Sequence, residues 1–139
     1  MENEVSTSVH PYGVDINLHH PSCDPAEITQ ELATKPWFAR KRGDVIAGIP
    51  HKSTSWLCHF QKGDGNVEFD QTLKALVSFI SEHHSFFQRF VEEEGTAEVV
   101  LNAKVPFDEG KLFDLSLDPF FLSELSQLHI QLRVQVWSA

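Results

Sequence analysis

The 139-residue chain has little cysteine, no excess of basic residues and no long apolar run. Two cysteines cannot build the disulfide framework of a small secreted domain. No apolar stretch reaches the roughly 20 residues that a membrane-spanning helix requires. The acidic start, Met1 to Glu4, lacks the basic-then-apolar order of a signal peptide. We therefore expect a cytoplasmic protein that has no membrane partner.

The charge is strongly acidic and unevenly distributed. Twenty acidic and 11 basic residues give a formal net charge of −9. Residues 1–62 carry 6 basic and 7 acidic residues, a net of −1, whereas residues 63–139 carry 5 and 13, a net of −8. Because an acidic surface repels phosphate backbones, we expect no nucleic-acid partner.

Length and composition predict one folded domain. The chain is 41% hydrophobic, which is enough to bury a core, and 139 residues is the usual size of a single domain. We expect residues 1–139 to form that domain and residues 1–8 to be flexible. The other loose stretches are residues 43–55 and the turn at 63–66.

Periodicity predicts the elements. Asp-Pro pairs at Asp24 and Asp118 are typical helix starts, because Asp caps free N–H groups and Pro suits the first turn. Apolar residues at helical spacing predict one long helix from about Asp70 to Glu94, ended by Gly95. Alternation of apolar and polar residues predicts the strands, which span about residues 14–18, 56–60, 97–105, 111–117 and 130–136, with an irregular or extended stretch at 37–42.

The element order is β-α-β-β-α-β-β-α-β, which favours the α+β class. We expect a largely antiparallel sheet with helices on one face. The first six elements follow the ferredoxin-like order, and the remainder forms a C-terminal β-α-β extension. The final strand is apolar on one face, so we place it inside the sheet.

Several short motifs resemble those of the bacterial domain of unknown function 4279. They are the strand followed by Asp24-Pro25-Ala26-Glu27-Ile28-Thr29, then Pro36, Gly43-Asp44 and Ser55 with Trp56, and lastly the long helix and closing strand. The resemblance covers about residues 14–137. It implies a small α+β domain without an established activity, and it transfers no catalytic residue. The chain departs from the pattern at Ala33-Thr34, where that family tends to have a glycine-containing turn.

Eight histidines raise the possibility of a metal site. Zinc favours imidazole and thiolate ligands, so one alternative is a metal- or small-molecule-binding protein, or an enzyme, that uses His19, His20, Cys23, Cys58 and His59. Three features oppose this alternative: adjacent histidines on a strand point to opposite faces, Cys58 lies on an aromatic face, and no C-x-x-C motif is present. We therefore assign no metal ligand and no cofactor.

No catalytic set is apparent either. Serine, histidine and aspartate residues are present, but none lies in a nucleophile elbow. Cys23 precedes a helix start, which lowers a thiol pKa, but the adjacent Asp24 carboxylate opposes that effect. We assign no catalytic residue and favour a role other than catalysis.

Basic and aromatic residues interleave between Lys35 and Asp44. Trp and Arg dominate binding hot spots, so Trp37, Arg40 and Arg42 form a candidate patch for an acidic or phosphorylated partner. A purely structural interpretation competes with this one. In that interpretation, which we weigh more heavily, Trp37 fills the edge of the core and the two arginines pair with the acidic second half.

The leading hypothesis is a non-catalytic protein-binding module. An acidic face would cover a basic partner, as in an immunity or antitoxin protein, and would speed their encounter by electrostatic steering. A homodimer is a further possibility, because an uncovered sheet edge can pair with a second copy. The candidate acidic face comprises Glu92, Glu93, Glu94, Asp108, Glu109, Asp114 and Asp118.

Overall fold

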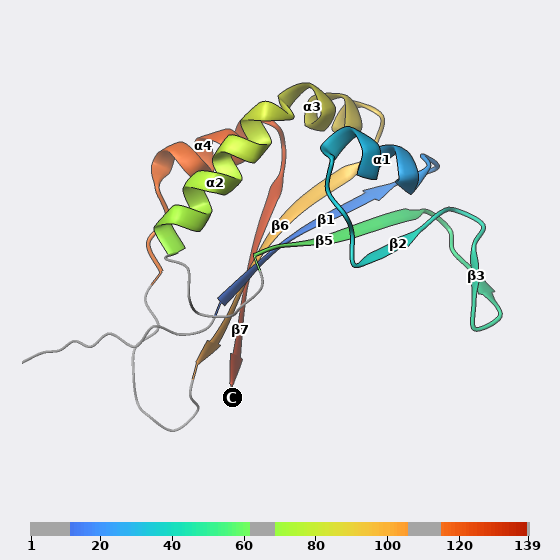
Figure 1. The fold of residues 1–139 in the computed structure, drawn as a ribbon, viewed down its shortest axis with the longest axis horizontal. Helices are drawn as coiled ribbons and strands as arrows, with labels where there is room; N and C mark the ends of the chain where they lie inside the picture. The colour runs from blue at the N-terminus through green and yellow to red at the C-terminus, as the bar shows by residue number, and fades with distance from the viewer. Residues whose placement is uncertain (1–11, 62–68, 106–114, 139) are drawn as a thin grey trace, which may run out of the picture.

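The computed structural model describes residues 12–61, 69–105 and 115–138 (Figure 1). A five-stranded sheet has the order β2-β5-β1-β6-β7, and β3 and β4 form a separate two-stranded ribbon. The sheet strands are β1 (Tyr12–His20), β2 (Phe38–Arg40), β5 (Thr54–Gln61), β6 (Thr96–Val105) and β7 (Gln131–Ser138). The ribbon strands are β3 (Val45–Ile46) and β4 (Ile49–Pro50), and the helices are α1 (Pro25–Leu32), α2 (Phe69–Glu82), α3 (His84–Glu92) and α4 (Pro119–Gln127).

The expected α+β class is confirmed. Three of the four strand pairings in the main sheet are antiparallel, and only β6 and β7 run parallel. The ferredoxin-like order is not confirmed. The strand β1 lies between β5 and β6 and is antiparallel to both, while the short β2 that follows α1 lies at the sheet edge.

The core lies between the sheet and the helices, which gather on one side of it in Figure 1. Val14, Ile16 and Leu18 alternate with more exposed residues along β1, so one face of this strand is buried. Their neighbours across the sheet include Trp56 and Val99, which are buried on the same face. We call this side the covered face, and the opposite side, which no described helix covers, the open face.

Both Asp-Pro helix starts are confirmed. The Asp24 carboxylate accepts the N–H of Ala26 at 3.0 Å, and the Asp118 carboxylate accepts the N–H of Phe120 at 2.7 Å. In each helix proline occupies the first turn, where its missing N–H costs no hydrogen bond.

The single long helix predicted for residues 70–94 is wrong, because the chain forms two helices that meet at His83. α2 packs against α4, whereas α3 packs against β6. The buried stripe of α2 ends at Ile80, and α3 buries both Phe86 and Phe87. One straight helix could not place the buried residues of α2 against α4 and those of α3 against β6.

α3 ends differently from the prediction. Glu94, rather than Gly95, has the left-handed conformation, with φ of 72°. Gly95 donates its N–H to the Phe90 carbonyl at 2.9 Å. A Cβ at Gly95 would lie 2.6 Å from that oxygen and from the Phe90 ring. Glycine is therefore required at 95 because two parts of the backbone approach closely.

Two strand predictions near the C-terminus need correction. Residues 115–118 are not in a strand, and residues 111–114 lie outside the described residues. β7 lies at the sheet edge instead of inside it. The helix α4 carries the chain across the covered face, as a parallel connection requires, and so places β7 directly beside β6.

Candidate functional site

The sheet separates the histidines and cysteines of the predicted cluster. His20 and Cys58 are buried on the covered side, whereas His19 and His59 are exposed. Across residues 12–61, 69–105 and 115–138, no three His, Cys, Asp or Glu side chains gather in a way that could hold a metal ion. These five residues are therefore not brought together as one site.

Neither cysteine is poised as a nucleophile. Burial raises the pKa of Cys58 to about 11, and the Asp15 carboxylate adds to the effect. Burial also raises the pKa of Cys23 to about 11, assisted by the carboxylates of Glu27, Glu93 and Asp24. A thiol with such a pKa is almost fully protonated at neutral pH, and the thiolate is the reactive form.

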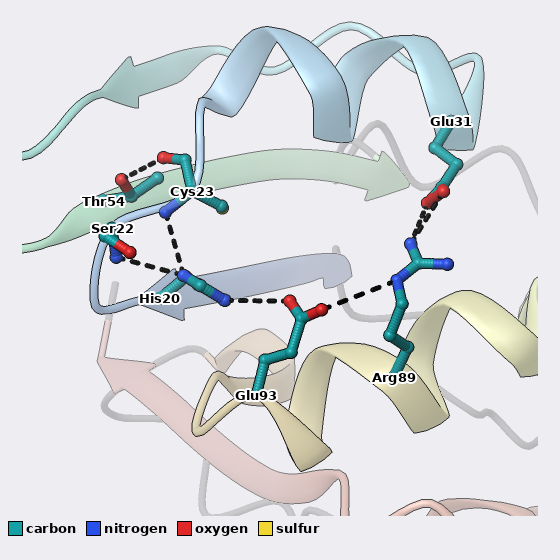
Figure 2. A network of polar contacts seen from close by, with 7 residues as sticks. All are labelled: His20, Ser22, Cys23, Glu31, Thr54, Arg89 and Glu93. Carbon is teal, nitrogen blue, oxygen red and sulfur yellow. Dashed lines mark hydrogen bonds and ion pairs between the residues drawn. The ribbon is translucent and has the colours of Figure 1, made fainter.

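His20 fixes the turn between β1 and α1 (Figure 2). Its Nδ1 atom accepts the backbone N–H groups of Ser22 at 3.1 Å and Cys23 at 2.9 Å. An Nδ1 atom that accepts cannot carry a proton, so Nε2 carries the proton and donates to the Glu93 carboxylate at 3.2 Å. Thr54 completes the turn by donating its hydroxyl to the Cys23 carbonyl.

A groove between α1 and α3 begins at this turn. Figure 2 shows the Arg89 side chain between two carboxylates, those of Glu31 on α1 and of Glu93, which caps the C-terminal end of α3. The adjoining cavity has a volume of about 460 Å³. Its lining, which we call the α1–α3 groove, comprises Cys23, Glu27, Ile28, Gln30, Glu31, Phe86, Arg89, Phe90 and Glu93.

The residues of the predicted acidic face are dispersed. Glu92, Glu93 and Glu94 lie at the end of α3, and only Glu93 lines the groove. Asp118 caps α4 and lines a different cavity together with Asp70 at the start of α2. Asp108, Glu109 and Asp114 lie outside the described residues.

Trp37 is exposed at the β2 edge of the sheet. Its side chain is 56% exposed, and its ring stacks on the His59 imidazole with the ring centres 5.2 Å apart. The structural interpretation placed Trp37 at the edge of the core, and that expectation is wrong. The indole ring spans the edge of the sheet and lies on a side chain of the open face.

Arg40 and Arg42 also differ from the structural interpretation. The Arg40 guanidinium lies 4.9 Å from the centre of the Phe38 ring and donates to the Ala39 carbonyl at 2.7 Å. In the described part of the chain neither arginine forms an ion pair. The expected pairing with the acidic second half is therefore absent there. We call Trp37, Phe38, Arg40 and Arg42 the edge patch.

Beyond the edge patch, the ribbon of β3 and β4 projects as an arm, residues 45–50 (Figure 1). The turn residues Ala47 and Gly48 both have positive φ, at 52° and 78°, as a tight hairpin turn requires. Val45 and Ile49 are 66% and 68% exposed. Sequence reasoning missed this hairpin because its strands have two residues each and its turn is Ala-Gly, without the usual Asn or Asp.

The open face carries a polar network beside the edge patch. The Asp15 carboxylate bonds to Nδ1 of His59 at 2.7 Å and accepts the Asn102 amide at 3.0 Å. Farther along the sheet, Arg133 forms an ion pair with Glu98 at 2.9 Å. These contacts pair the charged side chains at the centre of the open face. At the β2 edge, in contrast, Arg40 and Arg42 form no ion pair with a described residue.

The comparison with protein families gives one match. The family described as Domain of unknown function (DUF4279) matches residues 10–139, almost the whole chain. The chain belongs to this family. The resemblance inferred from the sequence motifs is therefore confirmed. No curated protein and no solved structure matches the chain.

Membership in DUF4279 adds no functional residue to the surfaces described above. The covered face of the sheet contributes to the core, and residues of α1 and α3 line the groove. None of the helices in the described ranges is both long and apolar enough to cross a membrane. The DUF4279 domain thus presents two contrasting surfaces, an acidic groove and a basic, apolar edge.

Proposed function

We propose that this DUF4279 domain is a non-catalytic protein-binding module that contacts an acidic partner through the edge patch and the arm. The observation that carries the proposal is the joint exposure of large apolar side chains and unpaired cations at one edge. Arg40, Lys41, Arg42 and Lys52 form no ion pair with any described residue.

The chemistry of the edge favours a protein partner. Aromatic and arginine side chains bury a large area at a small entropic cost, and they dominate interface hot spots. Trp37 is held against His59 and Arg40 against Phe38, so both side chains are ordered before a partner arrives. Preorganisation of this kind reduces the entropic cost of association.

An acidic partner follows from the local charge. Residues 40–52 contain four cations and one carboxylate, that of Asp44. The Asp44 carboxylate already accepts the backbone N–H of Lys41 at 2.8 Å. The edge therefore offers a net positive, partly apolar surface on a protein whose overall charge is −9.

Affinity capture from the native organism, followed by mass spectrometry, tests the proposal. The wild-type chain is compared with Trp37→Ala and with Arg40→Ala/Arg42→Ala. Phe120→Ala and Lys74→Ala are matched controls, because both side chains are exposed elsewhere on the molecule. We expect the edge variants to lose one stoichiometric acidic protein that both controls retain. Equal capture by all five proteins would reject the edge as the contact surface.

The α1–α3 groove supports a second candidate function. In this one the chain is an immunity- or antitoxin-like protein whose acidic surface covers a basic partner. Three carboxylates, Glu27, Glu31 and Glu93, line the groove against the single cation Arg89. In this case Glu27→Gln/Glu31→Gln would release a basic protein that Glu82→Gln, an exposed control, retains. The association rate should also fall as salt rises. A rate that is independent of salt would count against this candidate.

A further inference from the structure

The arm is a preformed element whose side chains are exposed, apart from the half-buried Ile46. Val45 pairs with Pro50 and Ile46 with Ile49, so the arm has an apolar residue on each of its faces. It belongs to no strand pairing of the main sheet. A two-stranded ribbon by itself is marginally stable in water. Two backbone bonds between Gly43, Asp44 and His51, at 2.9 and 2.8 Å, hold its base.

The α1–α3 groove is complementary in charge and polarity to the arm together with the cations at its base, which are Arg40, Lys41, Arg42 and Lys52. The groove lining contains three carboxylates and one guanidinium, a net of −2. The segment 40–52 has a net of +3, from four cations and one carboxylate. The groove is also lined by Ile28, Phe86 and Phe90, against which either apolar face of the arm, that of Val45 or that of Ile49, can pack.

We propose that a second copy of this chain is the partner of the arm, and that the arm of each copy docks in the α1–α3 groove of the other. The inference rests on the proposed function and names the occupant of the edge surface. The helix α1, which lines the groove, precedes β2 and the arm in the chain, and Figure 1 shows the arm extending beyond β2. In the proposed dimer a two-fold axis relates the copies, so that the same contact forms twice and the assembly closes.

Sedimentation equilibrium with charge-reversed pairs tests the dimer. The arm variant is Lys41→Glu/Arg42→Glu, and the groove variant is Glu27→Lys/Glu31→Lys. Each variant alone brings like charges together, so we expect at least tenfold weaker self-association than in the wild type. An equimolar mixture restores opposite charges at both contacts, and we expect a heterodimer of near wild-type affinity. Lys74→Glu and Glu82→Lys are controls that should dimerise normally.

Several outcomes overturn the inference. One is a wild-type chain that stays monomeric at about 100 µM in 0.15 M salt, and another is a mixture that fails to associate although each variant is folded by circular dichroism. Should the groove variant not fold, Glu27→Gln/Glu31→Gln replaces it, and unchanged dimerisation of that variant also rejects the groove. A monomer that still captures a different acidic protein through the edge patch would reject the dimer and support the proposed function.

Discussion

At the scale of single residues, one buried histidine organises the turn from which the groove begins. His20 is 8% exposed, and its Nδ1 atom accepts two backbone N–H groups while Nε2 bonds to Glu93. The neighbouring His19 is exposed, and its Nδ1 atom bonds to the Ser55 hydroxyl at 3.1 Å. Two adjacent residues of one type thus have different roles, because the strand directs them to opposite faces.

These roles predict different effects of the same substitution. His20→Leu preserves much of the side-chain volume but leaves two backbone N–H groups without an acceptor. We expect the free energy of unfolding to fall by about 1–2 kcal/mol. His19→Leu, the matched control, should change it by less than about 0.5 kcal/mol. Urea denaturation measures both, and equal effects would contradict the role assigned to His20.

The buried thiol Cys58 predicts a loss of stability at alkaline pH. Its pKa is raised from 9.0 to about 11 in the folded state, so the folded chain retains a proton that the unfolded chain releases. The free energy of unfolding should therefore fall as the pH rises from 9 to 11. Cys58→Ala should show a shallower fall than the wild type over this range, measured by urea denaturation at several pH values. Parallel curves would contradict the assignment.

At the scale of elements, local backbone geometry decides how each helix ends. α1 is capped by Ala33, with a φ of 50°, and Glu94, two residues after the end of α3, has a φ of 72°. Both are left-handed positions occupied by residues other than glycine, which is unfavourable by about 1 kcal/mol. The glycine beside Glu94 is instead required by the close approach of Phe90.

This arrangement predicts opposite effects at neighbouring positions. Gly95→Ala should lower the free energy of unfolding by about 1–3 kcal/mol, because its Cβ would overlap the Phe90 carbonyl and ring. Glu94→Gly should leave it unchanged or raise it by up to about 1 kcal/mol, because glycine adopts positive φ without strain. Thermal and urea denaturation of the two variants check the assignment. A stable Gly95→Ala protein would show that the helix end can shift to accept the methyl group.

At the scale of the whole molecule, helices cover one face of the sheet and the arm extends beyond its edge. The core uses residues from the main strands and from α1 to α4, but none from β3 or β4. The core and the proposed contact surface are therefore formed by different parts of the chain. The edge patch and the arm can change without a large effect on the core.

Two deletions test this separation. Replacement of Val45–Pro50 by two glycines removes the arm, and we expect cooperative unfolding with a loss below about 1 kcal/mol when the chain is monomeric. Removal of β7, residues 131–138, uncovers Val99 and Leu101 on the neighbouring strand β6. We expect that protein to lose its cooperative transition, because a core of this size cannot lose a strand. Circular dichroism during thermal unfolding distinguishes the two.

The local elements were predictable from sequence because their causes are local. Asp24 and Asp118 cap their helices through N–H groups two residues away, and alternation along β1 follows from the two-residue period of a strand. The prediction of a single helix through His83 was wrong for the opposite reason. Its division depends on which distant elements each half packs against.

The candidate site was less accessible to sequence reasoning. Trp37, Arg40 and Arg42 were predicted as one binding patch from their proximity in the sequence, but the exposure of Trp37 depends on the place of β2 at the sheet edge. The groove was not predicted, because Glu31 and Arg89 are 58 residues apart in the chain. The acidic residues of the second half looked like one face in sequence, yet Glu93 and Asp118 line different cavities.

The sequence by itself determined the α+β class, the helix starts, the alternation of the strands and the acidic charge. Each of these depends on residue type and on spacing within a few positions. Tertiary structure alone decided that β7 lies at an edge, that His20 and His59 lie on opposite faces of the sheet, and that basic and apolar side chains meet at β2. Those features depend on strand order, which is set by packing among residues far apart in the chain.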